Sequence, residues 1–102
     1  MAETIDEITV GYEENGMTLV EELDKIILTK GVWSTILFRY REYSQKTEGF
    51  GPTKATLRRY QKHQGVYKKR DSVNLTGASA RQLIEVLGEW LRDGLLDVAE
   101  GK

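Results

Sequence analysis

The even-numbered positions of the central segment, 32–43, are a better candidate for a core face than its odd-numbered positions. Ile36 and Phe38 occupy even-numbered positions, whereas Arg39 and Arg41 occupy odd-numbered ones. Successive side chains of a β-strand point to opposite faces of the sheet. We therefore expect a strand here, with its even-numbered side chains in the core and a more basic face on its odd-numbered side.

Two further alternating segments follow, at 54–62 and 66–75. The first is expected to place Arg58, Tyr60 and Lys62 together on one heavily basic face. A loop with two glycines and the only proline separates this segment from the central one, which is typical of a connection between antiparallel strands.

The last alternating segment, 66–75, predicts a strand with both polar and apolar residues on one side. Tyr67 and Val73 are expected on that side, and Lys68 and Arg70 on the other.

Residues 17–29 fit two structures. Thr18 and Glu21 match the capping box of a short helix. The apolar run 26–29, followed by a Lys-Gly pair, is instead typical of a strand that enters a tight connection. We favour a strand over residues 23–29.

The apolar spacing changes to a helical period after Thr76, which is a favourable N-cap residue. Leu83, Leu87 and Trp90 belong to one broad apolar stripe, and Gly94 is a plausible end of the helix. We expect this stripe to cover the apolar face of the sheet or to meet the matching helix of a partner.

The 102 residues suffice for one domain. We divide the chain into an acidic, partly flexible segment at 1–22, a single α+β domain at 23–93 and a tail at 94–102. With 39% hydrophobic and 30% charged residues, global disorder is disfavoured and a soluble protein is expected. The chain has no signal pattern, membrane-length apolar run or cysteine, so we expect a cytoplasmic protein.

The net charge of −1 hides an uneven distribution. Residues 1–29 hold eight acids and one base, residues 30–71 hold eleven bases and three acids, and residues 72–102 hold three bases and five acids. A block with a net charge of +8 can attract a polyanion, because attraction depends on the local potential within about 10 Å. The alternative is a solvated sheet face that only maintains solubility.

The first dozen residues are expected to form a mobile or loosely attached tail. An alternative is that the acidic segment competes with nucleic acid for the basic face, as an intramolecular mimic of phosphate.

The order of these elements resembles the transcriptional positive cofactor four family, small coactivators that bind single-stranded DNA. The likeness covers about residues 23–93 and is carried by Lys30-Gly31, Phe38-Arg39-Tyr40-Arg41-Glu42-Tyr43, Gly51-Pro52 and Val73-Asn74-Leu75-Thr76 with the helix that follows.

The resemblance implies a four-stranded antiparallel sheet followed by one C-terminal helix, assembled as a homodimer through helices and sheet. It also implies a curved sheet surface that takes single-stranded DNA or RNA. The chain departs from the family pattern at 54–69, which supplies an extra strand's length between the basic loop and the final strand.

Single strands are bound by cations that follow the phosphates and by aromatic rings on which bases stack. The candidate nucleic-acid contacts are Arg39, Arg41, Tyr43, Lys54, Arg58, Tyr60, Lys62, Tyr67, Lys68 and Arg70. Trp33 and Lys69 carry the same chemistry, although Trp33 also fits a core or dimer-interface position. We rank Arg41, Arg58, Tyr60 and Lys62 first, because the last three share a face and Arg41 lies on the basic side of the neighbouring strand.

We expect no enzymatic activity, cofactor, metal site or small-molecule substrate. The only histidine, His63, lies in a Gln-Gly turn, and no zinc-ligand, Walker or dinucleotide motif is present. Two hypotheses remain: a dimeric module that binds single-stranded nucleic acid, and a structural or adaptor dimer whose basic sheet meets an acidic protein.

Overall fold

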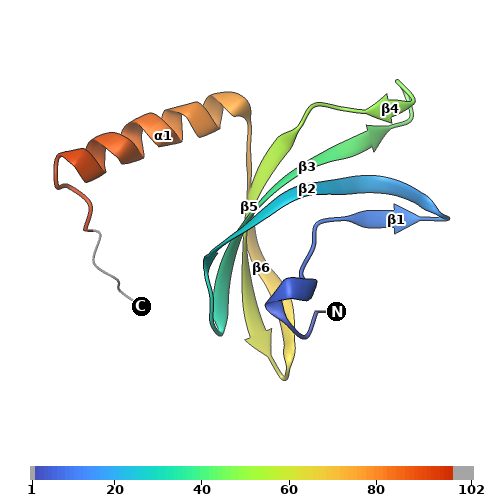
Figure 1. Cartoon of the computed structure of the whole chain (residues 1–102), viewed down its shortest axis with the longest axis horizontal. Helices are drawn as coiled ribbons and strands as arrows, with labels where there is room; N and C mark the ends of the chain where they lie inside the picture. Colours follow the sequence, from blue (N-terminus) through green and yellow to red (C-terminus); the bar gives the residue numbers. More distant parts are fainter. Residues whose placement is uncertain (1, 98–102) are drawn as a thin grey trace.

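The computed structural model describes residues 2–97 and has an α+β fold, as predicted. Figure 1 shows a curled antiparallel sheet with one C-terminal helix that extends away from it. Of the predicted tail at 94–102, only residues 94–97 lie within the described part.

The prediction of four strands is not confirmed, because the sheet has six. Their spatial order is β1-β2-β3-β5-β6, with β4 beside β3. The strands are β1 (Tyr12–Glu14), β2 (Met17–Thr29), β3 (Trp33–Ser44), β4 (Gly49–Phe50), β5 (Lys54–His63) and β6 (Val66–Leu75).

The additional strand length comes mainly from residues that were assigned to the acidic segment. A strand was predicted over 23–29, but β2 already begins at Met17, and β1 pairs with it. The connecting residues Asn15 and Gly16 have φ angles of 54° and 80°. Such left-handed residues are favoured in two-residue β-hairpins because their twist matches that of the flanking strands.

The core of the molecule lies on the face of the sheet that carries the even-numbered side chains of β3, as the alternation predicted. Ile36 and Phe38 are fully buried there, and Tyr40 is 7% exposed. We call this the inner face and the opposite one the outer face. Each β3 residue shares a face with the β5 residue directly opposite it. Ile36 pairs with Arg58, and Phe38 pairs with Thr56, so these β5 side chains also belong to the inner face.

The N-terminal segment, residues 2–10, packs across the inner face and differs from the expected loose tail. Ile5 and Ile8 are buried in the same cluster as Phe38. The Lys25 ammonium group donates hydrogen bonds to the carbonyl oxygens of Ile5, at 2.8 Å, and Ile8, at 2.7 Å. Burial of these apolar side chains, together with the lysine bonds, attaches the segment to the sheet.

A bulge corrects the predicted faces of β6. Asp71 lies opposite Arg59, whereas Lys69 lies opposite Tyr60, so Arg70 is an extra residue between the two pairs. A bulge changes the alternation of side chains along its strand. The part of β6 that precedes the bulge therefore places Tyr67 and Lys69 on the inner face, while Val73, after the bulge, lies on the outer face.

The predicted helix is α1 (Gly77–Arg92), and its N-cap is Thr76 as expected. The Thr76 hydroxyl oxygen accepts a hydrogen bond of 3.1 Å from the Ser79 N–H. The expectation that the helix covers its own sheet is wrong, because none of its residues is buried and it meets the sheet mainly at β6, where it begins. Among the described residues there is no helix with the length and apolar content that a membrane crossing requires.

Candidate nucleic-acid interface

Four cationic side chains line the inner face of β5 and β6. We call this set the basic strip: Lys54, Arg58 and Lys62 of β5 with Lys69 of β6. The three β5 residues follow the alternation of the strand, and Lys69 lies directly opposite Tyr60 on the same face.

Three members of the basic strip form no ion pair within residues 2–97. Lys62 and Lys69 are exposed. The Lys62 ammonium group lies 5.3 Å from the centre of the Tyr67 ring, within the range of a cation–π contact. The Nε atom of Arg58 is buried and has no hydrogen-bond partner. Buried polar atoms are normally paired, so this atom is an exception.

The fourth member, Lys54, is neutralised by a carboxylate. Its ammonium group donates a hydrogen bond of 2.9 Å to Glu42. This hydrogen bond, with the negative charge of Glu42, raises the pKa of Lys54 above its ordinary value. Lys54 therefore remains positively charged throughout the neutral range.

The two tyrosines of the inner face differ in exposure. Tyr60 is only 6% exposed and belongs to the core cluster beneath the N-terminal segment. Its predicted role as a stacking ring is therefore not supported while that segment is in place. Tyr67 is half-buried, and its hydroxyl group donates to the Gly31 carbonyl oxygen at 3.3 Å.

The arginines of the outer face are paired with acids on neighbouring strands. Arg41 and Arg39 of β3 form ion pairs with Glu21 and Asp24 of β2. The expectation that Arg41 adjoins Arg58 on one surface is wrong. The register pairs even-numbered residues of β3 with even-numbered residues of β5, and Arg41 therefore points to the opposite face.

Arg59 of β5 also belongs to the outer face. It forms an ion pair with Asp71 of β6, and its guanidinium group lies 4.6 Å from the centre of the Trp33 ring. Trp33 itself is 45% exposed.

The remaining predicted contacts lie at the two ends of the sheet. Tyr43 is half-buried and packs edge-to-face on Phe50, with ring centres 5.8 Å apart. At the other end, Lys68 and Arg70 are exposed near the β5–β6 turn. The Nε group of Arg70 donates a hydrogen bond to Gln61 on β5 at 3.0 Å.

A binding role for Lys30 was not predicted from the sequence. This exposed residue lies in the β2–β3 turn, which adjoins the end of β5 because the Lys62 N–H donates to the Val32 carbonyl oxygen at 2.7 Å. Lys30 thus adds a positive charge near the Lys62 end of the basic strip. Its Lys-Gly turn was visible in the sequence, but its position beside β5 depends on the strand register.

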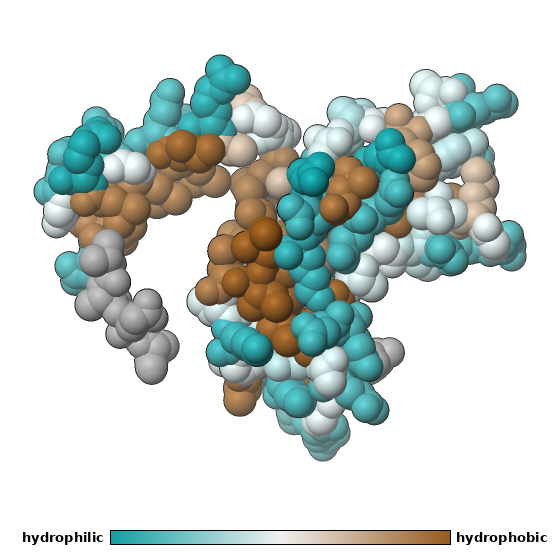
Figure 2. All heavy atoms as spheres, in the orientation of Figure 1, coloured by the Kyte–Doolittle hydropathy of each residue, from teal (hydrophilic) through white to brown (hydrophobic). Residues whose placement is uncertain are grey.

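Apolar side chains remain exposed on α1 and on the outer face of the sheet. In α1, Leu83, Leu87 and Trp90 are 43%, 39% and 44% exposed. On the outer face, Ile26 and Val73 are 48% and 55% exposed. Figure 2 shows hydrophobic atoms along one side of the helix and on the neighbouring side of the sheet.

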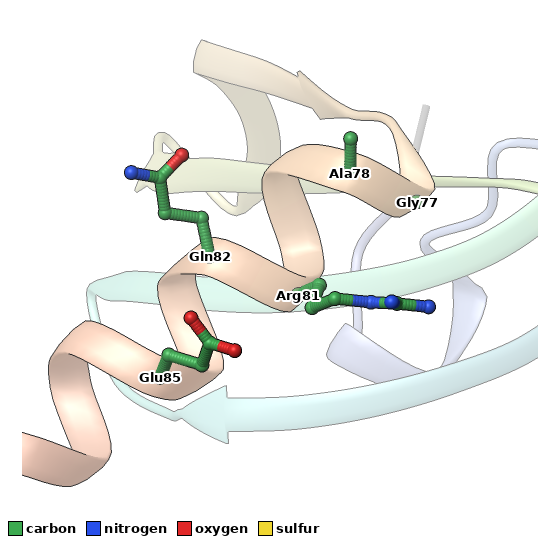
Figure 3. A pocket seen from close by; sticks show the side chains of 5 residues that line it. All are labelled: Gly77, Ala78, Arg81, Gln82 and Glu85. Carbon is green, nitrogen blue, oxygen red and sulfur yellow. The ribbon is translucent and has the colours of Figure 1, made fainter.

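Gly77, the first residue of α1, lines two hollows of the surface. One lies where the sheet meets the helix and is lined by residues of β3, β5, β6 and α1. The other is lined by α1 alone, through Gly77, Ala78, Arg81, Gln82 and Glu85. In Figure 3 the side chains of Arg81 and Gln82 point in opposite directions, so this second hollow gathers no set of converging groups. Within residues 2–97, no cluster of acidic, histidine or cysteine side chains has a metal-binding arrangement.

No family model matches the chain, and no curated protein or solved structure is significantly similar to it. Function is therefore inferred from the geometry of the described residues.

Proposed function

We propose that this protein binds single-stranded nucleic acid along the inner face of β5 and β6. The observation that carries the proposal is the set of unpaired cations on that face: Arg58, Lys62 and Lys69 have no carboxylate partner within the described part of the chain. Free cations release counterions from phosphates when a strand binds, and this release supplies most of the affinity of non-specific complexes.

The spacing of the basic strip suits a flexible single strand. Alternate residues on a β-strand lie about 6.6–6.8 Å apart, so Arg58 and Lys62 are separated by about twice that distance. An extended single strand can adjust its backbone to such a row of charges. Tyr67 adds a ring beside Lys62, which favours stacking of one base. Contacts of this kind hold the backbone and carry little sequence preference.

We further propose that the active form is a homodimer. The apolar stripe of α1 and the apolar outer face of the sheet are both exposed in the single chain, and a second copy offers the complementary surfaces to each. Large exposed apolar patches commonly mark protein interfaces. A two-fold arrangement through these surfaces would present two basic strips, one on each copy.

A fluorescence-polarisation titration tests the binding proposal. Labelled single-stranded and double-stranded oligonucleotides of equal length are titrated at two salt concentrations. We expect tighter binding of the single strand, with log affinity falling by about 0.7 per neutralised phosphate for each unit of log salt. Absence of binding at low salt would overturn the proposal and would favour the alternative of an acidic protein partner.

A further inference from the structure

A cavity of about 480 Å³ lies where the sheet joins the helix. Its walls include Tyr40 of β3, Lys54 of β5, Asn74 of β6 and Gly77 of α1. Lys54 follows the same alternation as Arg58, so the cavity continues the basic strip toward the start of the helix.

The first turn of α1 offers unused hydrogen-bond donors to this cavity. The N–H groups at the start of a helix have no acceptor within the helix. The Thr76 hydroxyl group satisfies the N–H of Ser79, which leaves those of Gly77 and Ala78; of these two residues, Gly77 lines this cavity. A Cβ atom built on Gly77 would meet no atom within 4 Å, so a ligand can approach its backbone closely. The positive end of the helix dipole favours an anion at this position.

A second feature of the cavity also indicates a ligand. The Tyr40 side chain lines the cavity and is 93% buried, since its exposed fraction is 7%. Its hydroxyl group makes no hydrogen bond to any residue between 2 and 97. The hydroxyl oxygen itself is not buried, because Arg58 Nε is the one buried polar side-chain atom without a partner within residues 2–97. The hydroxyl group of this otherwise buried residue is therefore open to the cavity, where a bound acceptor can reach it.

The charges around the cavity define what kind of ligand fits. Lys54 contributes an ammonium group, and Glu42, which also lines the cavity, holds that group at 2.9 Å. An acceptor with several oxygens would accept hydrogen bonds from the Gly77 N–H, the Tyr40 hydroxyl and the remaining ammonium hydrogens of Lys54. Glu42 opposes any anion, so its charge should lower the affinity.

We propose that this cavity binds a phosphate group, and, resting on the function proposed above, that this group belongs to the bound single strand. The strand then continues from the basic strip to the N-terminus of α1. The phosphate is either internal to the strand or a terminal monoester.

A matched pair of substitutions at Gly77 isolates the backbone donor. Gly77→Pro removes one N–H group at a helix position that tolerates proline, and the preceding residue, Thr76, already has the extended backbone that proline requires. Gly77→Ala keeps the N–H group. Inorganic phosphate is titrated into both variants while the amide signals of Ala78 and Ser79 are followed by NMR. We expect the proline variant to bind phosphate about tenfold more weakly than the alanine variant, because a hydrogen bond to a charged group is lost.

Two further variants separate a phosphate site from a change in the helix. Tyr40→Phe should also weaken phosphate binding, whereas Glu42→Gln should strengthen it by removing a like charge. Equal phosphate affinities in the two Gly77 variants, or no response of the amides to phosphate, would overturn the inference.

Oligonucleotides distinguish this inference from the proposed function. The affinities of Gly77→Pro and Gly77→Ala are measured for single strands that carry a 5′-phosphate, a 3′-phosphate or only hydroxyl ends. A deficit of the proline variant for every strand indicates an internal phosphate, and a deficit for one phosphorylated end indicates a terminal phosphate. If both variants bind all strands equally well, the proposed function stands and the phosphate site fails. If inorganic phosphate binds as expected but no strand binds, the phosphate site stands without the strand.

Discussion

On the outer face of the sheet, Arg39, Arg41 and Arg59 each lie beside a carboxylate on a neighbouring strand, whereas on the inner face Arg58 and Lys62 have no such neighbour within residues 2–97. Both groups look alike in the sequence, since each consists of cations on alternating strand positions. The comparison shows that the strand opposite a cation, more than the cation's own position, decides whether its charge is free for a ligand.

The two faces also differ in how their apolar side chains are covered. On the inner face, the N-terminal segment buries Ile36 and Phe38. On the outer face, Ile26 and Val73 remain about half exposed. The inner face therefore contains the core of the single chain, and the outer face is available for a second copy.

The largest expected effect comes from the inner core. Phe38→Ala should lower the free energy of unfolding by about 3–5 kcal/mol, because a fully buried ring is replaced by a cavity. Ile26→Ala on the outer face is the matched control and should cost much less at protein concentrations where the chain is monomeric. Urea denaturation of both variants measures the difference, and equal losses would contradict the assignment of the two faces.

The next effect concerns assembly. Leu87→Asp places a charge in the apolar stripe of α1 and should convert the proposed dimer to a monomer, with the helix signal in circular dichroism retained. Light scattering should give a mass of twice 11.7 kDa, the mass of one chain, for the wild type. For the variant it should give the mass of one chain. Glu89→Gln, which keeps a polar side chain, serves as the control. A wild type that is monomeric at high micromolar concentration would contradict the dimer.

A smaller effect is expected from the outer ion pairs. Arg59→Gln should change the free energy of unfolding by less than about 1 kcal/mol, because the pair with Asp71 is largely exposed. It should also leave the affinity for a single strand nearly unchanged, because Asp71 already neutralises this arginine. A tenfold loss of oligonucleotide affinity would show that the outer face takes part in binding.

The smallest effect is a pH dependence at Lys54. Glu42 raises the pKa of Lys54 in the folded state above its unfolded value, so the stabilisation is present at neutral pH and is lost as pH rises through the folded pKa. The difference in unfolding free energy between wild type and Lys54→Gln should therefore shrink above about pH 10. Urea titrations at a series of alkaline pH values measure it, and a difference that grows with pH would contradict the sign.

Local sequence patterns predicted the elements that depend on short-range chemistry. The alternation in β3 correctly indicated Ile36 and Phe38 as core residues, and Thr76 was correctly assigned as the N-cap of α1. These features follow from side-chain periodicity and from a hydrogen bond between residues three positions apart.

The features that the sequence did not reveal depend on pairing between distant strands. The bulge at Arg70 reverses which side chains of β6 point to the inner face, and no local sequence pattern predicts it. Glu21 was assigned to the acidic N-terminal segment, and Asp24 to the beginning of a short strand. In the sheet, Glu21 lies beside Arg41 and Asp24 lies beside Arg39. Part of the charge asymmetry along the chain is thus a set of ion pairs across β2 and β3.

The central claim is that the inner cations, and not the outer ones, bind the strand. The most direct test compares the salt dependence of single-strand affinity in the wild type and in two double variants. Lys62→Gln/Lys69→Gln removes two positive charges from the inner face, and Arg39→Gln/Arg59→Gln removes two from the outer face. We expect the inner double variant to reduce the slope of log affinity against log salt by about 1.4, which corresponds to two phosphate contacts, and the outer variant to keep the wild-type slope. Equal slopes for the two double variants, or a loss confined to the outer one, would contradict the account.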